Sequence, residues 1–229
     1  MMINFCCVLY GTKYPVEYAQ NLYNMVKRHL TIQHKFYIFT DNVRLKNIIQ
    51  GDVIVQQFPL HDMNGWWNKM QLFNPDTGLT GVNLYMDLDV VILKNIDCFA
   101  TFTNSKTFNI TSDFNGRQIW YNSSIMKWDS ERMIPIIWEK FIKDRQYWYR
   151  LQGDQNAITE LVRQEKDKSL VEPFPDNWSN SYKWFDRENP RFGKHLWTFE
   201  QKPDSKVAVF HGFPKPHQSE EQWVKDNWR

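Results

Sequence analysis

The chain has 229 residues, 42% of them hydrophobic and 24% charged, which suits one globular domain with a sizeable core and argues against disorder. Its 28 Lys and Arg against 26 Asp and Glu leave a formal net charge of +2, which argues against duplex nucleic acid as a partner. Cys6 and Cys7 are adjacent and Cys98 stands apart, so we expect neither a disulfide framework nor a zinc site.

Strand and helix patterns alternate over the first sixty residues. The apolar segment 3–10 predicts a strand that Gly11 ends, and apolar residues at helical spacing predict a helix over about 16–30. Segments 35–40 and 53–58 predict two further strands. This order predicts an α/β domain with a parallel sheet.

The remaining elements are expected at wider spacing. We predict helices over 66–73, 133–142 and 154–163, and strands over 82–86, 108–112, 119–127 and 206–210. The polar, aromatic segment 173–199 shows no clear period, so we expect loops there.

The sequence shows no signal for membrane targeting. The start MMINFCCVLYG lacks the basic residues and the long apolar core of a signal peptide. No apolar run approaches the roughly 18 residues that span a bilayer. We therefore expect a soluble, cytoplasmic protein without a transmembrane segment.

Aromatic residues make up 16% of the chain, with 11 Trp, 10 Tyr and 16 Phe. Most of these rings are expected to fill the core. Some could instead line a sugar-binding cleft, because ring faces stack on the apolar faces of sugars. Composition alone favours the core.

Two aspartates follow the predicted strand at 82–86, in the sequence YMDLDVVIL. Asp87 and Asp89 stand two residues apart, so on a strand their carboxylates would point to the same side. Converging carboxylates repel unless a cation lies between them, and oxygen ligands beside a diphosphate suit magnesium or manganese. The motif predicts a metal site; the alternative is a turn whose aspartates face water.

A predicted strand also leads into the turn VFHGFPKPH, residues 209–217. Histidine is the commonest metal-binding side chain, and a lysine can neutralise a phosphate. Taken alone, His211 and Lys215 fit a surface loop. Beside the Asp-x-Asp strand they become a candidate third metal ligand and a phosphate clamp.

Two polar segments are further candidates. In LQGDQNAI, Asp154 begins a helix either as its N-cap or as a carboxylate that faces a polyhydroxylated substrate beside Gln155. In WYNSSIMKW, Asn122 and Ser123 interrupt an apolar strand, either on the wet face of an edge strand or to hydrogen-bond a ligand.

These four motifs, in this order, resemble the glycosyltransferases of the GT-A fold, family 8, the group of glycogenin and the galactosyltransferases. The resemblance covers residues 5–217. It departs from the family at Ser124, where the family has Gly, and at His217, where the family has Trp. The loop between His211 and Lys215 is also two residues shorter than in the family. The resemblance implies a single domain over 1–229, with a nucleotide-binding half over 1–112 and an acceptor-side half with the metal and phosphate loop over 113–229.

The resemblance also implies roles for individual residues. Manganese, or magnesium, would bind Asp87, Asp89 and His211, and the catalytic set would be Asp154, Gln155 and Lys215. The nucleotide-sugar donor, with UDP as the expected nucleotide, would contact a larger set: Leu9, Tyr10, Gly11, Thr12, Tyr14, Lys69, Asp87, Leu88, Asn122, Ser123, Gly212 and Lys215.

The function that follows is metal-dependent transfer of a sugar to the hydroxyl of a carbohydrate or glycoconjugate acceptor, with retention of configuration. One alternative, a sugar nucleotidyltransferase, would want a basic, glycine-rich loop after the first strand, and YGTKYP has one Gly and one Lys. The other, an inactive sugar-binding module, would lose the metal ligands, whose candidates are all present.

Overall fold

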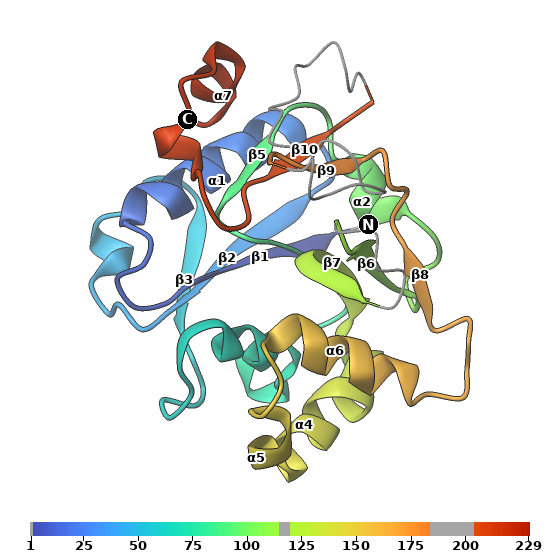
Figure 1. The fold of residues 1–229 in the computed structure, drawn as a ribbon. Coiled ribbons are helices and arrows are strands. Elements are labelled where there is room, and N and C mark those ends of the chain that lie inside the picture. The colour runs from blue at the N-terminus through green and yellow to red at the C-terminus, as the bar shows by residue number, and fades with distance from the viewer. Residues whose placement is uncertain (1, 115–119, 184–203) are drawn as a thin grey trace.

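A seven-stranded sheet forms the centre of the protein, in the order β3-β2-β1-β4-β7-β6-β8 (Figure 1). The structure is a computed structural model and describes residues 2–114, 120–183 and 204–229. The strands of this sheet are β1 Ile3–Leu9, β2 His34–Thr40, β3 Val53–Gln57, β4 Val82–Met86, β6 Phe108–Ser112, β7 Tyr121–Asp129 and β8 Val171–Pro173.

The sheet is mostly parallel. Strands β3, β2, β1 and β4 run parallel to one another, whereas β7 is antiparallel to both β4 and β6, and β8 is parallel to β6. The predicted α/β class is therefore confirmed. Because β7 lies between two partners, the edge-strand interpretation of Asn122 and Ser123 is wrong. Strands from both predicted halves, 1–112 and 113–229, share this sheet, and the functional division between them stays a prediction.

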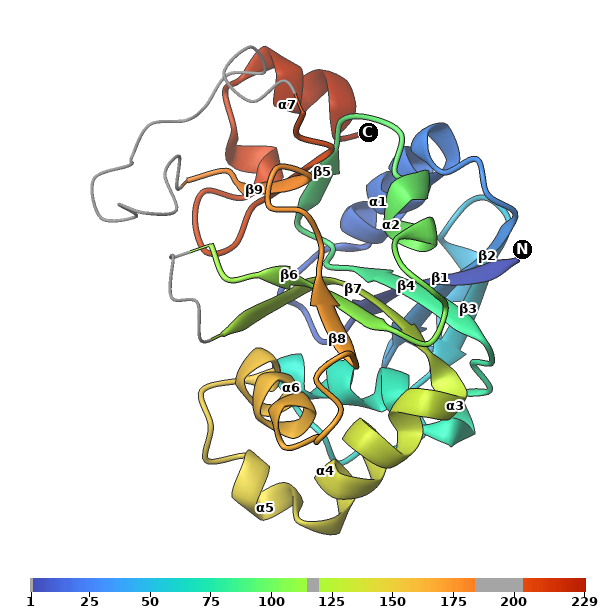
Figure 2. The same cartoon turned by 90° about the vertical axis from the view of Figure 1, so that its right-hand side faces the viewer.

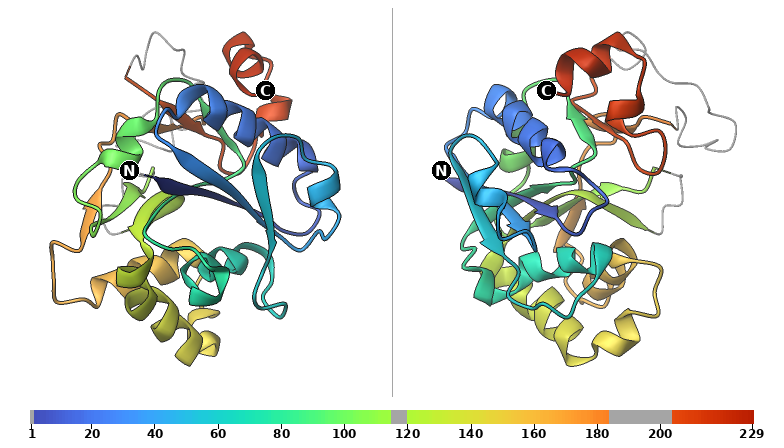
Figure 3. Two further views of the ribbon diagram at one scale, coloured as in Figure 1. Left: turned by 180° about the vertical axis from the view of Figure 1, so that it is seen from behind. Right: turned by 90° about the vertical axis from the view of Figure 1, so that its left-hand side faces the viewer.

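Alternating side chains on β1 supply both cores. Phe5, Cys7 and Leu9 pack in a cluster with helix α1 (Val16–His29), whereas Cys6 packs in a second cluster on the opposite face. Figures 2 and 3 show α1, α2 (Asp97–Thr101) and α7 (Gln222–Asn227) on one side of the sheet, with the helices of segments 65–73 and 130–163 on the other. The fold thus has helical layers on both faces of one sheet.

The second helical layer begins with a 3₁₀ helix, Gly65–Phe73, where the sequence predicts a short helix. The predicted helix over 133–142 is one continuous stretch made of α3 (Ser130–Met133), a π turn (Ile134–Trp138) and α4 (Glu139–Lys143). Pro135 lies in the π turn, and a proline there removes a backbone donor. The layer ends with α5 (Arg145–Trp148) and α6 (Asp154–Arg163). Elsewhere in the chain, single 3₁₀ turns occur at Leu45–Asn47, Pro75–Thr77 and Pro216–Gln218.

A small second sheet joins distant parts of the chain. Strand β10 (Val207–Val209) lies between β5 (Val90–Ile92), to which it is antiparallel, and β9 (Ser179–Ser181). Beyond the strands, the Phe210 N–H donates to the Asp89 carbonyl at 2.9 Å. This sheet carries the turn 211–217 to the Asp-x-Asp motif. Strand β9 falls within the segment expected to be loops, so that prediction is wrong at 179–181.

Among the described residues, no helix combines the length and the apolar character needed to cross a membrane.

Candidate active site

A pocket with a volume of about 820 Å³ opens at one edge of the central sheet. Residues that follow β1 and β4 line it, together with residues at the start of β7 and α6 and in the turn after β10. Ligands of open α/β sheets bind beside the carboxyl ends of the strands, which is where this pocket lies.

The predicted site residues gather in this pocket, with one exception. Those that line it are Tyr10, Gly11, Thr12, Tyr14, Lys69, Asp87, Leu88, Asp89, Asn122, Ser123, Asp154, Gln155, His211, Gly212 and Lys215. Leu9 does not line it, because strand alternation turns its side chain into the core under α1, while Val8 and Tyr10 face the pocket.

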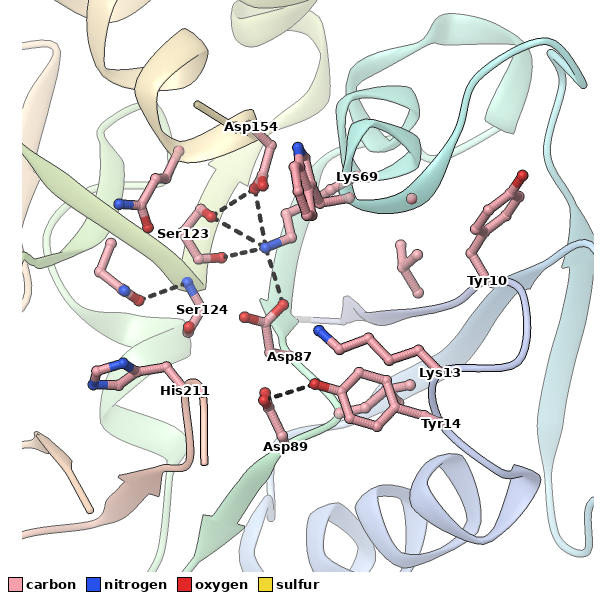
Figure 4. A pocket seen from close by; sticks show the side chains of 18 of the residues that line it. Tyr10, Lys13, Tyr14, Lys69, Asp87, Asp89, Ser123, Ser124, Asp154 and His211 are labelled. Carbon is pink, nitrogen blue, oxygen red and sulfur yellow. Dashed lines mark hydrogen bonds and ion pairs between the residues drawn. The ribbon is translucent and has the colours of Figure 1, made fainter. Parts of the chain in front are cut away.

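Lys69 connects two carboxylates at the centre of the pocket (Figure 4). Its Nζ lies 3.0 Å from Asp87 Oδ1 and 3.0 Å from Asp154 Oδ2, and it donates to Ser123 Oγ at 3.1 Å. Burial lowers the pKa of Lys69, but Asp154 and Asp87 together raise it above its usual value. The lysine is therefore a fixed, buried cation between two acids.

Asp154 is placed by this network and does not cap its helix. Gly153 is the N-cap of α6, and the helix start has no side-chain cap. The Asp154 carboxylate accepts from Ser123 Oγ at 2.6 Å in addition to its ion pair with Lys69. The N-cap interpretation of Asp154 is therefore wrong.

The two aspartates of the motif lie around a turn between β4 and β5 and still face one pocket. Lys215 forms an ion pair with Asp89, and the Tyr14 hydroxyl donates to the same carboxylate at 2.8 Å. Burial and the neighbouring Asp87 charge raise the pKa of Asp89, against the opposing effects of Lys215 and Tyr14. The alternative in which both aspartates face water is therefore wrong.

His211 lines the pocket but is held away from the aspartates. Its Nε2 shares a hydrogen bond of 2.7 Å with Ser181 Oγ, and its ring stacks on Phe114 at 5.5 Å between centroids. Burial, with Lys183 and Lys215 nearby, lowers the pKa of His211 to about 3, so the imidazole is neutral. Neutral imidazole can bind a metal, but here Ser181 engages one ring nitrogen.

The fit of this pocket to a divalent cation rests on its carboxylates. In the described ranges, no three His, Cys, Asp or Glu side chains come together as a metal-binding group. The half-buried Asp87 and the buried Asp89 nevertheless offer carboxylate oxygens in one pocket, and the charge of Asp87 raises the pKa of Asp89. Oxygen donors of this kind suit Mg²⁺ or Mn²⁺, and a cation would relieve their repulsion. His211 lines the same pocket, with its Nε2 engaged by Ser181.

Several pocket residues were missed by the sequence analysis. Tyr85 donates to Asp87 Oδ1 at 2.5 Å, and strand alternation from Asp87 could have indicated it. Lys13 places its Nζ 5.0 Å from the centre of the Tyr14 ring and lines the pocket. Trp66 precedes Lys69 by three residues, and in a 3₁₀ helix that spacing puts both on one face.

Comparisons with solved structures find this fold in glycosyltransferases. The glycosyltransferase GlyE of Streptococcus pneumoniae TIGR4 matches with a TM-score of 0.71 and 13% identity, over 95% of this chain and 57% of that one. The galactosyltransferase LgtC, in complex with donor and acceptor sugar analogs, matches with a TM-score of 0.65 and 12% identity, over 95% and 90%. Mouse xyloside xylosyltransferase 1 matches with a TM-score of 0.58 and 12% identity, over 93% and 100%.

No family model matches the sequence, and no curated protein matches it. The chain spans little more than half the length of GlyE but most of LgtC. With the seven-stranded, mostly parallel sheet and the pocket at its edge, these likenesses establish the architecture: the chain has the GT-A fold of the glycosyltransferases.

Proposed function

We propose that this protein transfers a glycosyl group from a nucleoside-diphosphate sugar to a carbohydrate hydroxyl, as a family 8 type enzyme. The observation that carries the proposal is the Lys69 network, which fixes Asp87 and Asp154 in one pocket of a GT-A fold. A buried ion pair is weak evidence for stability, and charged groups that lie buried in a pocket beside specific partners are candidates for function, so the network favours a functional role.

The diphosphate would lie at the Asp87 and Asp89 side of the pocket. These two carboxylates would hold Mn²⁺ or Mg²⁺, with His211 as a candidate third ligand, and the ion would supply charge stabilisation to the leaving diphosphate. Lys215 would release Asp89 and bind a phosphate oxygen of the donor instead, and its point charge would neutralise that phosphate. Its buried amine already lies against that carboxylate, so only a short movement is required.

The nucleotide would extend from there toward the loop after β1. Tyr10, Gly11, Thr12 and Tyr14 line that part of the pocket, and UDP is the expected nucleotide. Asp41 accepts hydrogen bonds from the Gly11 N–H at 3.0 and 3.2 Å, which holds the loop against β2.

The donor sugar would lie between the diphosphate and α6. Asp154, Asn122 and Lys69 would bind its hydroxyls and fix its orientation, with Gln155 beside the reacting carbon. In transfer with retention, the departing phosphate would accept the proton of the acceptor hydroxyl. We propose that the transferred sugar is a hexose.

The test is a panel of UDP, GDP and ADP sugars, with release of nucleoside diphosphate measured in Mn²⁺ and in EDTA. We expect one donor to be turned over in Mn²⁺, slowly with water and faster with an acceptor. Asp87→Asn should lower that rate more than about 100-fold, because the charge at the reacting centre is lost. Asp52→Asn is the matched control, since Asp52 is exposed and lies outside the pocket. Formation of a nucleotide sugar from sugar phosphate and nucleoside triphosphate would instead indicate a nucleotidyltransferase.

A further inference from the structure

We propose that Trp66 is the stacking platform of an acceptor subsite that takes the neutral pyranose ring of a carbohydrate. This inference rests on the proposed function, because it assigns the second substrate of the same pocket. Its residues, Trp66, Gln152 and Asn156, are not among the site residues named in the sequence analysis.

Trp66 is an exposed ring in a functional pocket. Its side chain belongs to the pocket lining, yet 58% of the residue is exposed, whereas neighbouring Trp67 packs on Phe141 and Tyr149. A large indole left open to water beside buried polar groups is the arrangement expected of a ligand platform. Trp66 lies on the same helix face as Lys69, the residue that joins the two acids.

The ring lies at the sugar end of the pocket. A Cβ built on Gly153 would lie 3.5 Å from Trp66 Nε1 and 3.7 Å from its Cδ1, so the pyrrole edge rests against the residue before Asp154. Asp154 is the residue proposed to hold the donor sugar. A ligand ring on Trp66 would therefore lie beside the transferred sugar, as an acceptor must.

Amide side chains line the same pocket. Gln152 is exposed and Asn156 is half-buried, both line the pocket, and within the described part of the chain neither side-chain amide has a protein hydrogen-bond partner. Each amide offers donors and an acceptor, which matches the hydroxyls of a sugar. Trp66, Gln152 and Asn156 are uncharged, which favours a neutral sugar over a phosphorylated one.

The competing occupant of the ring is the nucleobase of the donor. A base would also stack on an indole, with a comparable gain in affinity. The position beside Gly153 favours the acceptor sugar, because the residues expected to hold the base follow β1. The experiment must therefore measure both ligands on each variant.

The test is saturation-transfer NMR with the methyl α- and β-glycosides of glucose and galactose, beside calorimetric titration with UDP, GDP and ADP. Wild type, Trp66→Ala and Trp66→Phe are compared, with Tyr147→Ala as the matched control. Tyr147 is 49% exposed and lies outside the pocket. We expect wild type and Tyr147→Ala to bind at least one glycoside, Trp66→Ala to bind it about tenfold more weakly or worse, and Trp66→Phe to keep most of the affinity.

Three results would overturn the inference: no glycoside binds wild type, Trp66→Ala binds it unchanged, or Trp66→Ala loses nucleoside-diphosphate affinity by an equal or larger factor. The last result would assign the ring to the nucleobase. A wild-type protein that binds glycosides through Trp66 but turns over no nucleotide sugar would contradict the proposed transfer, and with it the acceptor role of the bound sugar, while sugar binding on Trp66 would stand.

Discussion

The backbone N–H of Phe210 donates a hydrogen bond of 2.9 Å to the carbonyl oxygen of Asp89. These residues are far apart in the sequence, and the bond fastens the turn 211–217 to the Asp-x-Asp motif. Lys215 then reaches Asp89 with its side chain, so backbone and side chain bring the two motifs together at one place.

Lys69→Met tests the central ion pairs. The variant leaves Asp87 and Asp154 without their shared cation, and removing one partner of a buried pair costs about 3–5 kcal/mol. We expect a loss in that range in the free energy of unfolding, measured by urea denaturation at pH 7. Lys13→Met is the control, because Lys13 lines the same pocket but is exposed, and it should stay within about 0.5 kcal/mol of wild type. Equal losses in both variants would contradict a structural role for the Lys69 network.

Lys215→Met tests whether the lysine and a divalent cation compensate the same carboxylate. Without metal, the variant leaves the buried Asp89 with the Tyr14 hydroxyl alone, and we expect a loss of about 3 kcal/mol. Mn²⁺ should then raise the melting temperature of the variant more than that of wild type, because the ion replaces the missing charge. Lys225→Met, at an exposed pair with Glu220, is the control for both measurements. If Mn²⁺ shifts neither melting temperature, the proposed metal site is wrong.

Gly212→Ala tests whether a ligand lies beside Gly212, and Gly81→Ala controls for the backbone strain that an added side chain causes. Gly212 has φ +71° and lines the pocket, and a Cβ there would meet the Lys183 amine, whose flexible end can move. Gly81 has φ +67° with open space around it and lies outside the pocket. Both alanine variants should lose about 1–2 kcal/mol of stability, since a side chain is strained in this conformation. Only Gly212→Ala should also lose affinity for UDP by calorimetry; an equal effect of Gly81→Ala would count against a ligand beside Gly212.

Lys127 gives the protein a pH-dependent stability away from the pocket. Only 1% of this residue is exposed, and its Nζ donates to the carbonyls of Phe102 and Asn104. Burial lowers its pKa from 10.5 to about 8, so between these values the unfolded chain holds the proton more tightly than the folded one. The free energy of unfolding should therefore rise from pH 8 to 9.5, by at most about 1.4 kcal/mol per pH unit.

The check is urea denaturation of wild type and Lys127→Met at four pH values in this window. The difference between the two isolates Lys127 from the tyrosines that titrate at higher pH. A slope that is the same in both proteins would show that Lys127 keeps an ordinary pKa.

The sequence predicts the central sheet well because its signals are local. Strands such as 82–86 and 108–112 have the predicted bounds, since each is a short apolar run between turn residues. In the small sheet, the strand predicted over 206–210 is confirmed as β10, whereas β5 and β9 were not predicted. Strand β9 is SNS, without apolar character, and it forms because β10 offers a parallel partner.

In the candidate site too, local sequence signals could be read, but contacts between distant parts of the chain could not. The Asp-x-Asp motif, His211, Lys69, Asp154 and Lys215 could all be identified from the sequence. Which lysine pairs with which carboxylate could not, because Lys69, Asp154 and Lys215 come from three separate parts of the chain. Whether a side chain is turned toward a neighbour is a property of packing. His211 shows this, since Ser181 and Phe114 decide where its ring points.

The pairing of β10 with β5 also has a consequence for protein synthesis. Residues 207–215 are made long after 82–92, yet they complete one wall of the pocket. A chain that is still attached to the ribosome at residue 180 would hold Asp87 and Asp89 without Lys215. The pocket of the nascent protein would thus lack this wall until the last strand has left the exit tunnel and closed a long-range contact, which is a slow step in folding.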